Sequence, residues 1–263
     1  IKLCRWAANY YQHPLGDVFN TALPSGLRLG GPAELTFESH WQLTPQGIET
    51  SSKQLTRAPK QAKALALLQE ISAKTTTPQA ESDLKQQGAA RASLQKLAEK
   101  QLASNVQRQP EAVRPASLLK QVHLPLNPEQ DQAFKAMNLG EFGTHLLYGT
   151  TGSGKTEVYL QAIEEVLTRG QRALVLIPEI GLTPQTLQRF TERFNRPLAL
   201  LHSGLNDGER TRNWIKAIHG QLDIVIGTRS AIFTPIPNLG IIIIDEEHDL
   251  SFKQQEGFRF SAR

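Results

Sequence analysis

The sequence predicts an α/β protein whose second half forms a parallel β-sheet and whose first half contains a small α+β domain. Three observations predict this fold class. After residue 125, short apolar runs alternate with helical stretches, a glycine-rich loop follows the first run, and two acidic residues follow the last. Apolar strands that alternate with helices form a parallel sheet covered on both faces, and ligands collect at the carboxyl ends of its strands.

The predicted sheet lobe covers residues 126–263. Its expected strands are 144–148, 173–177, 198–201, 223–226 and 240–244. Its expected helices are 155–168, 183–194 and 207–219. Two of these helices begin beside residues that favour N-cap positions, Thr183 and Asn206, which supports their predicted starts.

The first half is predicted to contain three parts. Residues 1–35 include a Gly/Pro-rich stretch and are too few to bury a core, so we interpret them as the end of a preceding domain. Residues 36–103 combine one strand with three helices, the last of them basic, which is typical of a winged-helix domain. The alternative is a plain three-helix domain that packs on its neighbour. Residues 104–125 contain three prolines and few apolar groups, and are predicted to be a linker.

The composition excludes several classes of protein. The chain is 39% hydrophobic and 21% charged, as is usual for soluble globular proteins. No apolar run approaches the roughly 20 residues that span a bilayer, so no membrane partner is expected. The single cysteine, Cys4, excludes an internal disulfide and a multi-thiolate zinc site within these residues. A reducing cytoplasm is the simplest compartment.

The charge is distributed unevenly along the chain. Residues 1–120 contain 15 Lys/Arg and 9 Asp/Glu, whereas residues 121–263 contain 14 and 16. A basic first half suits a polyanionic partner such as nucleic acid, because each neutralised phosphate releases condensed counterions. The alternative is a solvated surface without such a partner.

The glycine-rich loop has the spacing of a phosphate-binding loop. Residues 149–156 read Gly-Thr-Thr-Gly-Ser-Gly-Lys-Thr and stand between a predicted strand and a predicted helix. The glycines allow backbone N–H groups to face phosphate oxygens, and the helix N-terminus favours an anion. Lys155 is expected to reach the β- and γ-phosphates, and the Thr156 hydroxyl to bind Mg²⁺. The predicted ATP contacts in this loop are Gly149, Thr150, Thr151, Gly152, Ser153, Gly154, Lys155 and Thr156.

Acidic residues terminate the most apolar of the predicted strands. Four isoleucines at 241–244 run directly into Asp245 and Glu246. We expect Asp245 to hold Mg²⁺ and Glu246 to accept a proton from the water that attacks the γ-phosphate. An acidic surface turn is the alternative, but it leaves the joint occurrence with the phosphate loop unexplained. A lone His248 without Cys or His partners is a poor zinc ligand, so a coupling role is favoured.

Longer stretches of the chain resemble the PriA family of bacterial replication-restart helicases, which are superfamily 2 proteins of DEAH type. The matching strings are WAANYYQHPLGDVF (6–19), TGSGKTEVYL (151–160), PEIGLTPQT (178–186), LHSGLNDGER (201–210), GTRSAIF (227–233) and, within 244–260, IDEEHD and KQQEGFRF. The resemblance implies that 126–263 is a truncated, RecA-like ATP-binding helicase lobe. It also implies that 1–35 ends a DNA-binding domain, and that the chain is a central fragment of a longer protein.

The resemblance also assigns roles to single residues. Gln130 resembles the glutamine that contacts adenine, although a lone helical glutamine is ordinarily just solvated. Residues 178–185 and 228–230 resemble two motifs that hold a DNA strand, and 249–263 resembles an aromatic-rich loop that senses DNA. Arg229 alternatively pairs with a carboxylate, and the phenylalanines alternatively belong to the core. The DNA contacts implied by the resemblance are Pro178, Thr183, Thr228, Arg229, Ser230, Phe252, Lys253, Phe258 and Arg259.

The implied activity is ATP-dependent 3′→5′ movement on DNA that restarts replication at stalled forks. The implied partners are single-stranded DNA, forked DNA, D-loops, primosome proteins and single-strand-binding protein, and the implied location is the bacterial cytoplasm, in association with the nucleoid. ATP and Mg²⁺ are the expected cofactors, while the family's zinc module, its second motor lobe and its arginine finger lie outside this chain. Because an arginine finger supplies roughly 10³–10⁵ in rate, we expect these residues alone to hydrolyse ATP hardly at all.

Two other functions remain open from the sequence. The chain is alternatively part of another superfamily 2 DNA translocase, such as a RecG-like fork remodeller or a restriction translocase. It is alternatively a winged-helix DNA-binding regulator whose phosphate loop serves only as a switch. The regulator requires Glu246 to be dispensable.

Overall fold

The computed structural model describes residues 1–263 except 35–37, 52–54, 56–57, 76, 109–113, 116 and 151. The chain divides into two compact units, one made of residues 1–34 with 111–263 and the other of residues 35–110. Within the described ranges, no helix combines the length and apolarity that crossing a bilayer requires.

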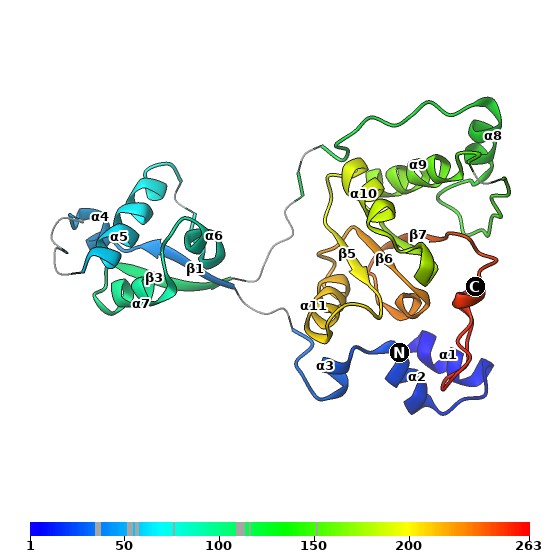
Figure 1. The fold of residues 1–263 in the computed structure, drawn as a ribbon, viewed down its shortest axis with the longest axis horizontal. Coiled ribbons are helices and arrows are strands. Elements are labelled where there is room, and N and C mark those ends of the chain that lie inside the picture. Colours follow the sequence, from blue (N-terminus) through cyan, green and yellow to red (C-terminus); the bar gives the residue numbers. More distant parts are fainter. Residues whose placement is uncertain are drawn as a thin grey trace. The chain divides into compact units, whose positions relative to one another are not determined.

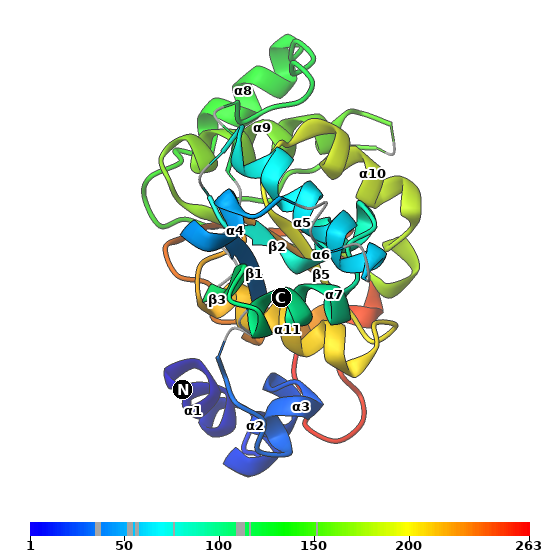
Figure 2. The ribbon, with the colours of Figure 1, turned by 90° about the vertical axis from the view of Figure 1, so that its left-hand side faces the viewer.

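The unit of residues 35–110 is an α+β fold (Figures 1 and 2). Its elements are β1 (Glu38–Leu43), α4 (Pro45–Glu49), α5 (Pro59–Ser72), β2 (Gln79–Ala80), α6 (Glu81–Gln86), α7 (Arg91–Glu99) and β3 (Ala103–Arg108). The strands form an antiparallel sheet in the order β2-β1-β3. Trp41 packs against leucines of α5, α6 and α7, among them Leu65, Leu84 and Leu94, which are all fully buried. Three helices therefore cover one small sheet.

The boundary predicted for the linker is wrong at its start. The structure pairs residues 103–108 with β1, from Glu38 opposite Arg108 to Leu43 opposite Ala103. The stretch has little apolar periodicity, and its pairing depends on a strand 60 residues earlier in the chain. The sequence pattern of residues 103–108 therefore does not predict this strand, because its pairing is a tertiary interaction.

The other unit contains the parallel sheet. Its elements are α1 (Lys2–Tyr10), α2 (Leu15–Ala22), α3 (Ser25–Arg28), α8 (Pro128–Ala136), α9 (Lys155–Thr168), β4 (Arg172–Leu176), η2 (Glu179–Gly181), α10 (Pro184–Arg193), β5 (Leu198–Leu201), α11 (Asp207–Ile218), β6 (Ile224–Gly227), η3 (Arg229–Phe233), β7 (Leu239–Ile244) and η4 (Leu250–Phe252). The strand order is β5-β6-β4-β7 and every neighbouring pair is parallel. The predicted α/β class, with a parallel sheet after a small antiparallel region, is confirmed.

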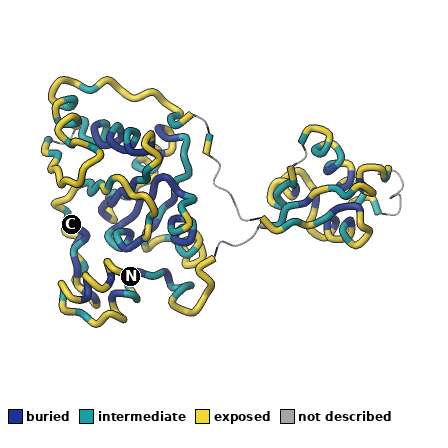
Figure 3. Tube along the Cα trace, turned by 180° about the vertical axis from the view of Figure 1, so that it is seen from behind, coloured by how far each residue is buried: buried dark blue, intermediate teal, exposed yellow. Residues whose placement is uncertain are grey.

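Both faces of the two inner strands, β4 and β6, are covered, as continuous apolar strands require. Val175 and Ile226 point to the face that holds α9 and α10, where they meet Ile163 and Phe190. Residues at the alternate positions, such as Leu174, are buried on the opposite face, where η3 contacts β4 and α11 contacts β5. Figure 3 shows the buried residues, in dark blue, along the strands and α9.

The strand predicted at 144–148, ahead of the phosphate loop, does not form. This segment is described but belongs to no ladder, and Leu146 and Tyr148 are 78% and 93% exposed. The sheet instead ends at β7, whose Ile242 is 45% exposed. An apolar run becomes a strand only when its N–H and C=O groups find a ladder partner, and the run alone does not specify one.

The N-terminal helices pack on the sheet unit at its C-terminal segment. The Tyr11 hydroxyl donates to the Ser261 carbonyl at 3.3 Å and accepts from the Ser261 N–H at 3.2 Å. The rings of Tyr11 and His13 meet Phe258 edge-on, with centroids 5.8 and 5.4 Å apart. Residues 1–34 and 249–263, from opposite ends of the chain, therefore lie side by side (Figure 1).

Candidate nucleotide site

The glycine-rich loop has the backbone geometry that its sequence predicts. Gly152 and Gly154 have φ of 83° and 84°, in the left-handed region, and Gly154 is the N-cap of α9. A methyl group on Gly154 would also collide with Nε2 of Gln130. Thr151 lies outside the described residues. Because the first N–H groups of a helix lack intrahelical acceptors, the loop and α9 together favour an anion.

Replacing Gly154 with alanine tests this cradle. The substitution forces a left-handed φ on a residue with a Cβ and pushes Gln130 away, so we expect ATP affinity to fall at least about tenfold. Gly170→Ala is the matched control, because Gly170 has φ of 71° and no atom within 4 Å of the added methyl. Titration with a fluorescent ATP analogue measures both, and equal affinities in the two variants would contradict a role for the loop.

Lys155 and Gln130 both contact the loop backbone. The Lys155 ammonium donates to the carbonyls of Gly149 and Thr150, at 2.6 and 3.1 Å. Gln130 donates from Nε2 to the Ser153 carbonyl at 2.8 Å, while its Oε1 accepts from the Asn127 N–H. Gln130 thus closes the capping box of α8 and holds the loop at the same time. Both the NH₂ group and the carbonyl oxygen of the Gln130 amide are therefore hydrogen-bonded to protein groups.

The acidic residues follow β7, and β4 fixes the start of that turn. The Asp245 N–H donates to the Leu176 carbonyl at 2.9 Å, which continues the ladder by one residue. The next residue, Glu246, has φ of 48°, a left-handed conformation that is uncommon for a residue with a side chain. Its N–H donates to Asp245 Oδ1 at 3.1 Å. Glu246 is exposed, and His248 beside it is 81% exposed with Nδ1 3.8 Å from the Glu246 carboxylate.

Asp245 is connected to the phosphate loop by a residue that the sequence did not single out. The hydroxyl of Tyr159, on α9, lies 3.3 Å from Asp245 Oδ2. Burial raises the pKa of this hydroxyl, and the Thr156 side chain, three residues earlier on the same helix, lowers it. The positions i and i+3 of a helix share a face, and this spacing is the signal that was available. Tyr159 therefore joins the two predicted Mg²⁺ ligands.

The pKa of the Asp245 carboxyl reflects its burial, its hydrogen bonds and the charges around it. Burial raises the pKa of the Asp245 carboxyl above its ordinary value, and the neighbouring Glu246 carboxylate adds to the rise. Hydrogen bonds from Tyr159 and from the Glu246 backbone lower the pKa, and so does the positive charge of Lys155. The lysine of the loop and the acid of β7 thus interact across the carboxyl edge of the sheet.

The residues present fit a nucleotide triphosphate with Mg²⁺. The loop supplies glycines at positive φ and a helix N-terminus, and the Thr156 hydroxyl and Asp245 carboxylate are the hard oxygen ligands that Mg²⁺ prefers. Among the described residues, no three His, Cys, Asp or Glu side chains gather as an all-protein metal site. That agrees with Mg²⁺ sites generally, which use one or two protein ligands together with substrate phosphates and water.

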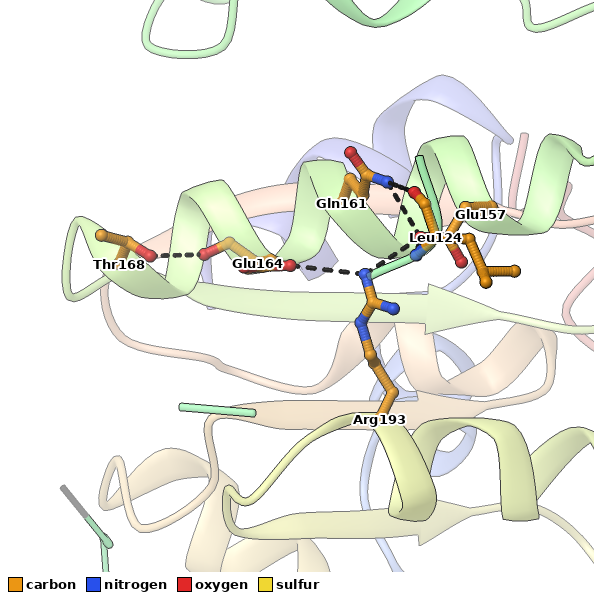
Figure 4. A network of polar contacts seen from close by, with 6 residues as sticks. All are labelled: Leu124, Glu157, Gln161, Glu164, Thr168 and Arg193. Carbon is orange, nitrogen blue, oxygen red and sulfur yellow. Dashed lines mark hydrogen bonds and ion pairs between the residues drawn. The ribbon is translucent and has the colours of Figure 1, made fainter. Parts of the chain in front are cut away.

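A buried ion-pair network anchors α9 to α10 (Figure 4). Arg193 Nη2, at the end of α10, lies 3.0 Å from Glu157 and 3.4 Å from Glu164, both on α9. The Arg193 side chain is only 7% exposed. Glu157 also accepts from the Leu124 N–H and from Gln161, at 3.2 and 2.9 Å. The helix that begins at the phosphate loop is therefore fixed to the helix that begins at Thr183.

The predicted DNA contacts differ in exposure. Thr183, Lys253 and Arg259 are exposed, and Arg229 and Ser230 are partly exposed. The side chains of Pro178, Thr228, Phe252 and Phe258 are buried. Of the two interpretations of the phenylalanines, the burial of Phe252 and Phe258 favours the core. Their rings are 0% and 3% exposed, and Phe258 stacks on Phe260 with centroids 5.0 Å apart. Arg259, which is exposed, stands between the buried residues Phe258 and Phe260.

Two of the other candidates meet in one pocket. Arg229 donates from Nη1 to the Ser251 carbonyl at 3.0 Å, so it binds a backbone oxygen and not the carboxylate of the alternative interpretation. An open pocket of about 360 Å³ is lined by Arg229, Leu250, Ser251, Lys253 and residues 254–256. Thr183 caps α10 by accepting from the Thr186 N–H at 3.2 Å, as its position predicted.

Comparison with known proteins places these features in a family. Residues 127–262 match the family model of the DEAD/DEAH box helicases. The chain is 44% identical over 261 residues, 98% of its length, to the replication restart protein PriA of Haemophilus influenzae. PriA of Bacillus subtilis is 51% identical over 144 residues, or 53% of this chain, and PriA of a Synechocystis species is 56% identical over 132 residues, or 50%. The chain spans 35%, 18% and 16% of the lengths of these three relatives.

Proposed function

This chain belongs to the DEAD/DEAH box helicase family, and from that premise we propose that its sheet unit binds ATP with Mg²⁺ in a DNA motor that restarts replication. The similarity to PriA proteins from three bacteria supports the narrower part of this proposal. The chain spans 35% of the Haemophilus relative and less of the other two, so activity is proposed for a full-length protein that contains these residues.

One observation carries the proposal, namely that the phosphate loop and the acids of β7 meet at one edge of the sheet. Tyr159, on the helix that follows the loop, donates to Asp245, and the charge of Lys155 lowers the pKa of Asp245. An acidic surface turn would require none of these contacts. The carboxyl edge of a parallel sheet is also where α/β folds bind nucleotides.

Each group of residues in the site has a separate proposed role. The loop backbone and Lys155 bind and orient the phosphates, while Thr156 and Asp245 are placed to hold Mg²⁺. Mg²⁺ held there would supply positive charge that neutralises the phosphates. Glu246, exposed beside Asp245 and held by an N–H bond to it, orients the attacking water and takes its proton. His248 lies next to Glu246 and is proposed to transmit the state of this site to a second lobe.

The proposed DNA surface lies on the segments that follow β4, β6 and β7. Thr183 is exposed at the start of α10, and Arg229 and Lys253 line the pocket below η4. Two cationic side chains and one helix N-terminus suit phosphate oxygens. Because Phe252 and Phe258 are buried, backbone phosphate contacts carry this proposal and base stacking on those two rings does not. Single-stranded DNA, forks and D-loops are the proposed substrates, with primosome proteins as partners.

Replacing Lys253 with alanine tests the DNA surface in the full-length protein. Loss of one phosphate contact is expected to weaken DNA binding uniformly across sequences and to reduce the salt slope of binding by about 1. Lys135→Ala is the control, because Lys135 is exposed on α8 and paired with Asp131. Binding to single-stranded and forked DNA at several salt concentrations measures the slope. A slope for Lys253→Ala equal to that of Lys135→Ala would contradict this surface.

The unit of residues 35–110 is proposed to bind DNA as a winged-helix-like domain. Helices α5, α6 and α7 and the antiparallel sheet suit that architecture. The basic residues of its last helix are partly compensated, since Arg91 lies 3.6 Å from Glu81 and Lys96 lies 2.8 Å from Glu99. A regulator with a nucleotide switch therefore has less support than the motor, whose site contains the exposed Glu246.

A further inference from the structure

Building on the proposed function, we propose that Tyr159 is a positioning residue that sets the two Mg²⁺ ligands of the ATP site through its hydroxyl group. Its hydroxyl lies 3.3 Å from Asp245 Oδ2, and Thr156 stands three residues earlier on the same face of α9. One side chain thus spans the distance between helix α9 and the end of β7. Among the described residues, Tyr159 is the one whose side chain is hydrogen-bonded to the Asp245 carboxylate.

The hydrogen bonds of Asp245 show what this contact accomplishes. The carboxylate accepts from Tyr159 at Oδ2 and from the Glu246 N–H at Oδ1. A carboxylate offers about four acceptor sites, so each oxygen keeps one for a metal ion or a metal-bound water. Tyr159 therefore fixes the orientation of the carboxylate plane and leaves an acceptor site free on each oxygen. Through Oδ1 the same carboxylate holds the backbone of Glu246, which sits at φ of 48°.

The ring of Tyr159 is held as firmly as its hydroxyl. The residue is 6% exposed, and its ring stacks on Phe190 of α10 with centroids 6.4 Å apart and an interplanar angle of 17°. Phe190 is fully buried. Because both the ring and the hydroxyl of Tyr159 are held by contacts, the hydroxyl has one fixed position. A fixed hydrogen-bond partner is what orients a metal ligand. The stack also connects the metal ligands to α10, which begins at the exposed Thr183.

A simpler interpretation is that Tyr159 is a core residue whose hydroxyl bonds to the nearest acceptor. Phenylalanine would pack in this position equally well, and burying a hydroxyl is unfavourable unless it is hydrogen-bonded. The interpretations differ in what removal of the hydroxyl changes. If Tyr159 is only a core residue, removing its hydroxyl changes the stability of the fold alone. If it is a positioning residue, removing the hydroxyl changes the Mg²⁺ dependence of nucleotide binding.

The test is Tyr159→Phe in the full-length protein, measured by titrating a fluorescent ATP analogue at a series of Mg²⁺ concentrations. We expect the Mg²⁺ concentration for half-maximal binding to rise about tenfold, as for other outer-shell partners of metal ligands. Nucleotide binding in the presence of EDTA should stay unchanged. The matched control is Tyr11→Phe, because the Tyr11 hydroxyl makes a bond of the same 3.3 Å length, to Ser261, away from the loop.

The outcomes separate the inference from the proposed function. Unshifted Mg²⁺ dependence in Tyr159→Phe, with normal Mg²⁺-dependent binding in the unaltered protein, overturns the inference alone. Equal losses of binding with Mg²⁺ and with EDTA also overturn it, because they indicate a merely structural role. Absence of Mg²⁺-dependent binding in the unaltered protein overturns the proposed function as well.

Discussion

Glu246→Gln in the full-length protein is expected to lower DNA-stimulated ATP hydrolysis by about 10²–10⁴-fold, the usual contribution of a general base. Glutamine keeps the shape of the side chain but cannot accept the proton of the attacking water. The loop, Lys155 and Asp245 are unchanged, so ATP affinity should be retained. Steady-state hydrolysis with saturating single-stranded DNA and an equilibrium nucleotide titration together measure the two effects.

The neighbouring acid provides the matched control for this prediction. Glu247 is also exposed, but it points to Arg263, 3.3 Å away, and has no role in the proposed chemistry. Glu247→Gln should therefore leave hydrolysis within a few-fold of the unaltered rate. If Glu246→Gln hydrolyses ATP at the unaltered rate, the motor is the wrong function, and a DNA-binding regulator with a nucleotide switch becomes the better one.

Arg193→Met is expected to lower the local free energy of unfolding of α9 and α10 by about 3 kcal/mol, the low end of the range for breaking a buried ion pair. The substitution leaves Glu157 and Glu164 close together without their shared cation. The low end applies because these carboxylates keep 16% and 24% side-chain exposure. Native-state hydrogen exchange of the α9 and α10 amides measures the change directly.

An exposed ion pair offers the comparison for Arg193. Lys135 pairs with Asp131 at 2.6 Å on α8, with 73% and 46% of the two side chains exposed. Lys135→Met should change stability by no more than about 0.5 kcal/mol. Equal protection of α9 in the two variants would show that the network in Figure 4 does not anchor the phosphate-loop helix.

The sequence predicted most of the sheet unit because its signals are local. Helix α9 spans Lys155–Thr168, strand β5 spans Leu198–Leu201, and both agree with the predicted bounds. The caps Thr183 and Asn206 accept backbone N–H groups as expected. Gly152 and Gly154 adopt the positive φ that a phosphate loop needs. Capping, glycine conformation and apolar periodicity are all properties of short segments, so they are visible without the fold.

The features that the sequence did not predict all depend on tertiary partners. Residues 144–148 have the composition of a strand but no ladder partner, whereas residues 103–108 lack that composition and have one. The ring of Phe258 is buried because Tyr11 and His13, about 250 residues away along the chain, pack on it. Tyr159 was missed because a buried aromatic on an apolar helix face ordinarily indicates core, and its hydroxyl partner, Asp245, comes from a distant strand.

The most direct test is an experimental structure of the full-length protein with Mg²⁺ and a non-hydrolysable ATP analogue. The account predicts that the triphosphate lies in the loop of residues 149–154 and that Thr156 and Asp245 both face the metal ion. Glu246 should face the water beyond the γ-phosphate. A structure in which the two acids lie on the opposite side of the sheet from Lys155, or in which the analogue binds elsewhere, would contradict it.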